Sequence, residues 1–311
     1  MRARSRGPMI DYDAHEWRET LFEVHGSMLR EIGARVAVCV AWSIGVVAVH
    51  LHVRKVDMPP TVHTLVGVAL GLLLVFRTNA SYDRFWEGRK MWGGIVNETR
   101  NLVRATRVLL DKDLDLHAVL ARWTAAWCYS TMENLRGGRS VGPERLALPA
   151  RDLDAALAAQ HIPLHIAVRM STLLQQARER GLISDFQQMT LDQNVQLLID
   201  YMGACERIHK TPLPFAYVVH LRRALILYCF ALPFVLVETF GWGAVAGTMF
   251  VAYVFFGIEE IGVEIEDPFG TDDNDLPLER ICETIERNLM ALTKDAPPTA
   301  LPVPVLSAPP V

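Results

Sequence analysis

Carboxylates, histidines and cysteines are the side chains of this sequence whose spacing could do chemistry. Eight carboxylates occur between Glu259 and Asp275. Such a density could bind calcium, but the loop lacks the spacing of an EF-hand, and a solvated acidic turn is the simpler interpretation. His50, His52 and His63 could bind a transition metal near one predicted membrane face. They have no fixed ligand spacing, so histidines that simply lie at the membrane–water interface are the simpler interpretation.

The remaining reactive groups do not indicate an enzyme. The five cysteines are scattered singly without a CxxC pair, which favours reduced, buried thiols over disulfides or a zinc cluster. The sequence contains no Walker-type phosphate loop, HExxH zinc helix or GxSxG nucleophile elbow. Arginine-rich stretches flanked by aromatic residues lie at a predicted membrane exit, so we predict no nucleic-acid partner.

Four apolar runs dominate the chain. Residues 36–53 carry no Asp, Glu, Lys or Arg, residues 61–76 follow after a Pro-Pro turn, and two further runs cover 224–240 and 241–258. Four runs of this length are hard to bury without lipid, since about 20 apolar residues cross a bilayer as a helix. Between them, residues 108–220 show helical periodicity with little strand signal, which predicts a helical soluble layer.

The second apolar run carries the most informative pattern. Val68, Leu72 and Phe76 repeat every four residues and therefore share one helix face, which could line a pore. Gly67 and Gly71 form a GxxxG pair that allows close helix packing. From spacing alone, ordinary packing or lipid contact is the simpler explanation of both features. The run continues without a break into a charged segment, so we expect one helix that leaves the membrane and continues into water.

The basic residues predict the orientation of the spans. Arginines and lysines precede the first span, follow the second and precede the third, whereas the outer loops hold only Arg54 and Lys55. By the positive-inside rule both termini and the helical layer are cytoplasmic. The predicted division is 1–33 for an N-terminal cytosolic or interfacial segment, 34–77 for two transmembrane helices, 78–221 for the cytosolic helices, 222–260 for two more transmembrane helices, 261–295 for an acidic segment and helix, and 296–311 for a disordered proline-rich tail.

Three long motifs resemble those of one protein family. FRTNASYDRFWEGRKMWGGIVNETRNLVR at 76–104, CERIHKTPLPFAY at 205–217 and EIEDPFGTDDNDLPL at 264–278 are similar to bacterial bestrophins and stand in the family's order. The similarity extends over roughly residues 20–290. The resemblance implies an all-α membrane protein with four transmembrane helices and a large cytosolic helical region, assembled as a homopentamer around a central pore.

The resemblance also implies roles for individual residues. The family's hydrophobic neck falls on Val68, Leu72 and Phe76, and its cytosolic constriction falls on Phe186, with Ile183 as the alternative. Animal relatives bind calcium after the fourth span. This chain has the bacterial EDPFG form there, which leaves calcium binding open; the candidate ligands are Glu264, Glu266, Asp267, Asp272, Asp273 and Asp275.

We therefore predict a passive channel for small monovalent ions in the bacterial inner membrane, whose partners are its own copies, membrane lipid and the permeant ions. The family contains chloride channels, while its bacterial members are associated with cations, so a cation is slightly favoured. Dewetting of the apolar neck would gate the pore. The alternative is a non-conducting receptor or scaffold whose cytosolic helices bind a partner.

Overall fold

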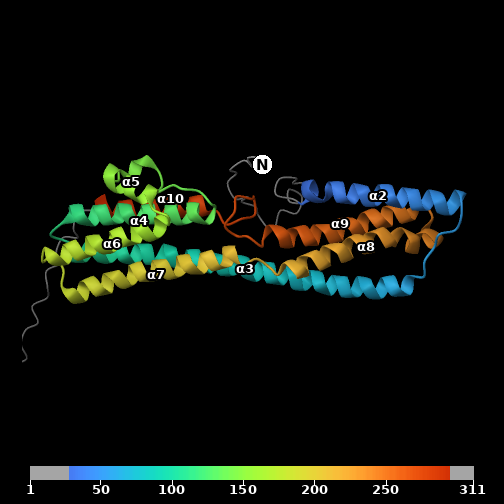
Figure 1. The fold of residues 1–311 in the computed structure, drawn as a ribbon, viewed down its shortest axis with the longest axis horizontal. Helices are drawn as coiled ribbons and strands as arrows, with labels where there is room; N and C mark the ends of the chain where they lie inside the picture. The colour runs from blue at the N-terminus through green and yellow to red at the C-terminus, as the bar shows by residue number, and fades with distance from the viewer. Residues whose placement is uncertain (1–27, 295–311) are drawn as a thin grey trace, which may run out of the picture. The chain divides into compact units, whose positions relative to one another are not determined.

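The computed structural model describes residues 28–294, and every regular element in that range is a helix (Figure 1). The α-helices follow the order α2 (Leu29–His52), α3 (Pro60–Leu109), α4 (Leu114–Leu135), α5 (Ala150–Ala158), α6 (Ile162–Glu179), α7 (Asp185–Lys210), α8 (Phe215–Phe240), α9 (Gly243–Glu264) and α10 (Leu278–Lys294), with a 3-10 turn at Glu144–Leu146. By contacts the described chain divides into two compact units, and α3 and α7 each contribute residues to both.

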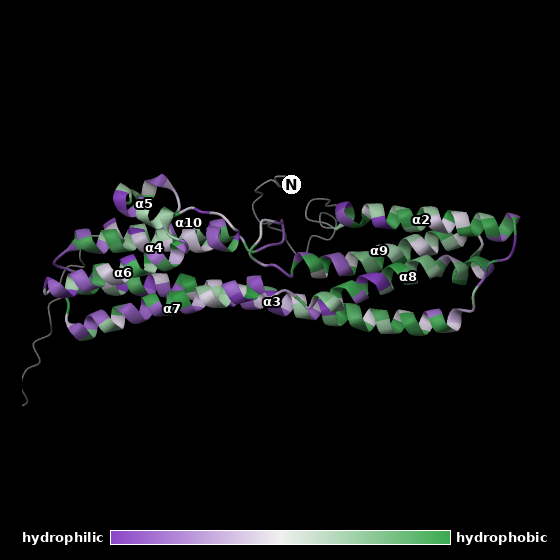
Figure 2. Cartoon of the chain, in the orientation of Figure 1, coloured by the Kyte–Doolittle hydropathy of each residue, from purple (hydrophilic) through white to green (hydrophobic). Residues whose placement is uncertain are grey.

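The first unit contains residues 28–90 and 207–277. Its core is apolar and is shared by four helices: α2, the first part of α3, α8 and α9. The buried side chains include Ile32, Leu74, Leu225 and Phe256, one from each helix. Figure 2 colours these helical stretches mostly as hydrophobic.

These four helices have the length and composition of membrane spans. In none of them is more than 28% of the most apolar 18-residue window buried inside the protein. Helices that are apolar on all sides and yet leave most of that surface uncovered need a non-aqueous surrounding. The first unit therefore carries the membrane-spanning part of the chain.

The second unit contains residues 91–206 and 278–294 and is built around α4. Along α4 Trp123, Trp127 and Cys128 are fully buried, because α6 and α10 pack against it. Asp113 is the N-cap of α4, and its side-chain carboxylate accepts a hydrogen bond from the backbone N–H of Leu116 at 2.9 Å. The phenol of Tyr129 donates to Glu286 of α10 at 2.7 Å, which satisfies a buried carboxylate.

Each region that the sequence predicts to be helical contains helices in the structure, although α2 and α8 begin seven and nine residues before the apolar runs 36–53 and 224–240. The clearest agreement is α3, one unbroken helix of 50 residues whose apolar first part continues into a charged second part. The predicted helical layer at 108–220 contains α4, α5, α6 and α7, and the helix predicted within 261–295 corresponds to α10. Most of the N-terminal segment 1–33 and the tail 296–311 lie outside the described residues.

Candidate functional site

The membrane part of α3 has two faces with different surroundings. Val68, Leu72 and Phe76 are 71%, 56% and 56% exposed on the protomer. Leu70 and Leu74, which lie two residues away and therefore point to the opposite side of the helix, are buried in the core of the first unit. The sequence-predicted neck residues thus share the face that the protomer itself does not cover, and their place in a pore stays a prediction.

The two glycines of the GxxxG pair have different neighbours. A Cβ added at Gly67 would come within 2.6 Å of the Tyr228 hydroxyl, so α3 and α8 approach closely at this point. Tyr228 has little room to turn away, because its ring lies between His63 at 3.8 Å and Phe255 at 5.3 Å between centroids. A Cβ at Gly71 would meet no atom within 4 Å. Of these two glycines, only Gly67 lies at a close helix contact within the protomer.

Directly after the predicted neck, α3 carries a buried cation. Arg77 is 1% exposed, and its Nη2 lies 3.1 Å from Oε2 of Glu266, which follows the end of α9. Glu266 accepts a second hydrogen bond through Oε1, from the backbone N–H of Leu213 at 2.8 Å. Gly262 makes room for the arginine, because a Cβ there would lie 3.4 Å from the Arg77 Cγ. The neck end of α3 is therefore tied to the acidic segment.

A second arginine of α3 strengthens this connection. Arg84 donates to the backbone carbonyls of Glu266 at 3.0 Å, of Ile208 at 2.7 Å and of Thr211. Two of these carbonyls belong to the end of α7 and the residue after it, where helix carbonyls lack partners. Sequence reasoning did not predict these contacts of either arginine. An arginine directly after an apolar run, with carboxylates concentrated elsewhere, was the available signal.

The acidic residues proposed as calcium ligands are held by the protein in different ways. Asp267 lies 3.3 Å from Nδ1 of His209, and Glu266 binds Arg77 as described above. Asp275 is buried and accepts a hydrogen bond from the backbone N–H of Asp272 at 2.7 Å. Burial raises the pKa of the Asp275 carboxyl to about 7, and nearby carboxylates, including Asp272, add to the increase. Calcium binding by Glu264, Glu266, Asp267, Asp272, Asp273 and Asp275 stays a prediction.

The two candidates for the cytosolic constriction differ in exposure. Phe186, in the first turn of α7, is 73% exposed, whereas Ile183 is 5% exposed and packs into the second unit. A side chain buried in its own protomer cannot project into a pore. Phe186 is therefore the stronger of the two candidates, and its role stays a prediction.

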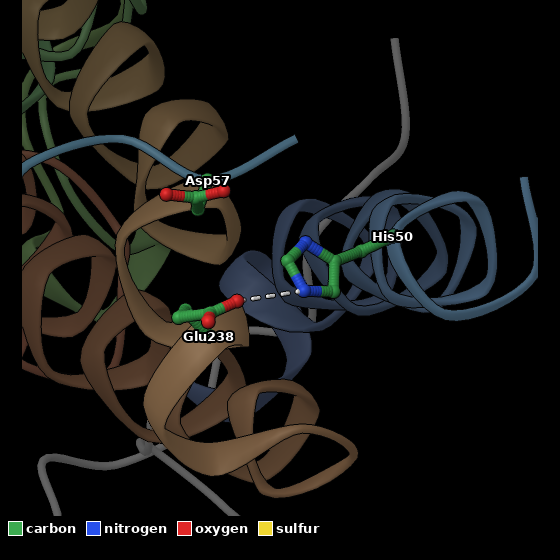
Figure 3. A group of neighbouring side chains, drawn as sticks. All are labelled: His50, Asp57 and Glu238. Atoms are coloured by element: carbon green, nitrogen blue, oxygen red, sulfur yellow. Dashed lines mark ion pairs between the residues drawn. The ribbon is translucent and has the colours of Figure 1, made fainter. Parts of the chain in front are cut away.

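One group of side chains within the described residues has metal-ligand geometry. The ligand atoms of His50, Asp57 and Glu238 all lie within 4.8 Å of one another (Figure 3). The three histidines considered from the sequence do not come together as a group. His63 instead contacts the Tyr228 carbonyl at 3.1 Å, and the group gains two carboxylates that the sequence analysis did not associate with it.

The contacts of His50 favour a structural hydrogen-bond network over a metal site. Its Nδ1 accepts from the backbone N–H of Val56 at 3.2 Å, so in the neutral ring the proton sits on Nε2, which lies 3.1 Å from Glu238. A metal on Nε2 would move that proton to Nδ1, opposite the Val56 N–H. Lys55 also binds Glu238 at 2.9 Å, and this contact raises the pKa of the lysine. The arrangement joins the end of α2, the following loop and α8.

Comparison with known proteins identifies the family. The model of the bacterial and fungal bestrophin protein family matches residues 9–291. The chain belongs to this bestrophin family. A crystal structure of a bacterial bestrophin homolog from Klebsiella pneumoniae has a TM-score of 0.79 and 33% identity, covering 86% of this chain and 100% of that one.

Curated relatives of this bestrophin carry the names of channels. A voltage-dependent anion channel-forming protein of Synechocystis sp. is 40% identical over 303 residues, which are 94% of this chain and 95% of the relative. The voltage-dependent anion channel-forming protein YneE of Escherichia coli K12 is 32% identical, covering 93% and 95%. The protein is therefore an integral membrane ion channel and not an enzyme.

Proposed function

We propose that this bestrophin is a homopentameric channel that passes small monovalent ions passively along a central axis lined by α3. The observation that carries the proposal is the exposed apolar face of α3 with Val68, Leu72 and Phe76. Exposure on the protomer would also fit contact with lipid, but these three residues match the hydrophobic neck of the bestrophin family, which favours the axis. Five copies around an axis would turn the face into three stacked apolar rings.

The chemistry of such rings predicts how the channel opens and closes. Aliphatic and aromatic side chains offer no oxygen atoms to replace the water around an ion, so an ion must pass with its hydration shell. Conduction then depends on whether the neck holds water, and gating by dewetting follows. Phe186, exposed near the start of α7, would form the second constriction on the cytosolic side. Both termini would then be cytoplasmic in a bacterial inner membrane.

The apolar neck does not select the sign of the ion, so charges near it must do so. Asp83 is exposed and lies seven residues after Phe76, which places it close to the same face of α3 about 10 Å further along the helix. A ring of five carboxylates near the neck would attract cations. Lys90, a further seven residues along, is exposed on that face too, but it is farther from the neck. We therefore favour cation conduction, although the names of the curated relatives refer to anions.

Purified protein in planar bilayers tests the channel and its neck together. Leu72→Ala and Phe76→Ala are each expected to raise the single-channel conductance, because a smaller side chain widens the ring and lets it hold water. Unchanged conductance in both variants would remove the neck from this face of α3. An absence of current from the wild type in all salts would favour the non-conducting receptor or scaffold.

Reversal potentials in asymmetric potassium chloride test the sign of the ion. We expect the wild type to reverse toward the potassium equilibrium potential. Asp83→Asn should move the reversal potential toward zero, while Asp111→Asn, a control carboxylate beyond the end of α3, should leave it unchanged. Reversal toward the chloride potential in the wild type would overturn cation conduction without affecting the neck.

A further inference from the structure

The first unit contains a cavity that the channel mechanism does not use. A space of about 570 Å³ opens among α2, α8 and α9, and its walls include Val38, Leu225, Ile226 and Phe256. This volume lies within the range of small-molecule and lipid pockets, roughly 300–1,000 Å³. Val38 and Ile226 are exposed at its rim, so the cavity opens to the surface of the membrane-spanning helices.

The two ends of the cavity differ in chemistry. Trp42 lies just beyond one end, where its indole N–H donates to the Phe230 carbonyl at 3.0 Å and the two rings lie 5.5 Å apart between centroids. Arg35 and Arg222 line the other end. Arg35 and Trp42 are seven residues apart on α2, about 10 Å along the helix. That length fits within one leaflet, since the hydrocarbon core is about 30 Å thick.

The arginines keep hydrogen-bond donors free for a ligand. Arg222 donates through Nε to Oε1 of Glu259 at 2.8 Å, and Arg35 donates through Nη1 to Glu260 at 2.6 Å. The same Nη1 of Arg35 lies 3.7 Å from Oε2 of Glu259, which therefore contacts both arginines. Both arginine side chains are about half exposed, at 50% and 45%. Two arginines and two glutamates sum to no net charge. An anion would therefore be held by the remaining guanidinium N–H groups, to which charge-assisted hydrogen bonds are strong.

We propose that this cavity binds an anionic phospholipid, with one acyl chain against Val38 and Ile226 and the phosphate on the guanidinium N–H groups of Arg35 and Arg222 that the glutamates leave free. The occupant follows from the surroundings: the walls are apolar, the cavity lies in the membrane-spanning unit, and guanidinium donors line the end formed by Arg35 of α2 and Arg222 of α8. A bound lipid would connect these two helices at the end predicted to be cytoplasmic. The proposal does not depend on the ion pathway.

Photo-crosslinking in liposomes tests the site without measuring a current. The full-length protein is reconstituted with a trace of phosphatidylglycerol that carries a diazirine in its acyl chain, and adducts are mapped by mass spectrometry. We expect adducts in segments 34–42 and 222–230. Unlabelled phosphatidylglycerol should compete for this site, phosphatidylcholine should compete roughly tenfold less well, and glycerol phosphate without a chain should not compete.

Three variants separate the head-group contacts from the apolar walls. Arg35→Gln with Arg222→Gln should reduce the adducts roughly tenfold, the size expected for lost charge-assisted hydrogen bonds. Arg223→Gln is the matched control, because it removes the same charge from the next residue of α8, which does not line the cavity. Val38→Trp should fill the cavity and abolish the adducts while leaving the arginines in place. Size-exclusion profiles check that each variant stays folded.

Several results would overturn the proposal. Equal competition by the two phospholipids would show that the arginines do not select the head group. Adducts that survive Val38→Trp would place the lipid outside the cavity. An absence of lipid adducts in segments 34–42 and 222–230 of the wild type would show that no lipid fills this space.

Discussion

The two faces of α3 differ in what surrounds them, and the proposed channel gives each face a different task. One face, with Leu70, Leu74 and Arg77, is buried against the other helices of the first unit. The other face, with Val68 and Leu72, is equally apolar but is not covered within the protomer. The two faces are therefore not distinguished by their apolar side chains. They differ in whether other helices of the first unit cover them. Substitutions on the first face should therefore change stability, and substitutions on the second should change ion flow.

The largest loss of stability is expected when the buried ion pair is broken. Arg77→Met leaves Glu266 without its cation in a mostly buried place, which should cost about 4 kcal/mol and lower the melting temperature in detergent. The double variant Arg77→Met with Glu266→Gln should recover a substantial part of that loss, because no buried charge is left alone. A single variant as stable as the wild type would show that the pair does not hold α3.

The two leucines of α3 give a matched comparison of the faces. Leu74→Ala removes a side chain that is 2% exposed and should cost about 3 kcal/mol by leaving a cavity, with unchanged conductance. Leu72→Ala should change protomer stability by no more than about 0.5 kcal/mol while it raises conductance. Denaturant titration and single-channel recording of both variants measure the contrast. The reverse pattern would exchange the roles of the two faces.

The glycine pair tests close packing at a finer scale. Gly67→Ala should destabilise the protein by about 1–3 kcal/mol, because its methyl group would meet the Tyr228 hydroxyl at 2.6 Å. Tyr228→Phe in the same chain should restore part of the stability by removing that oxygen. Gly71→Ala is the control and should be tolerated within the protomer. Equal thermal stability of both alanine variants would show that α3 and α8 do not pack this closely.

The smallest effect concerns one loop of the acidic segment. Burial raises the pKa of Asp275 to about 7, above its unfolded value, so the folded carboxyl keeps its proton where the unfolded one has lost it. This contribution to stability is present in full below the unfolded pKa and is lost as pH rises toward and through 7. Hydrogen exchange of residues 270–276 should therefore show lower protection factors at pH 8 than at pH 5. Asp275→Asn should flatten this dependence, and a persistent dependence would assign it to another group.

Much of the helical layout could be predicted because it depends on local patterns. The four-residue spacing of Val68, Leu72 and Phe76 predicts a shared face, and the absence of a break after Phe76 predicts the long α3. Spacing alone could not say which face is covered, since Leu70 and Leu74 have the same apolar character. That distinction requires the neighbouring helices.

Contacts between distant residues were not predictable from one sequence. Arg77 and Glu266 are 189 positions apart, and His50 and Glu238 come from different helices that meet only in the folded chain. Periodicity says nothing about such pairs. The same limit applied to Phe186 and Ile183, which lie three residues apart and could be separated only by their exposure in the fold.

Cysteine accessibility tests most directly whether the exposed face of α3 lines a water-filled axis. The five native cysteines are buried, so a new cysteine at position 72 can be modified selectively. In Leu72→Cys channels a charged, membrane-impermeant methanethiosulfonate should react and alter the current, while Leu74→Cys channels should be unaffected. Modification of Leu72→Cys only by lipid-soluble reagents, with unchanged current, would place this face against lipid and contradict the account.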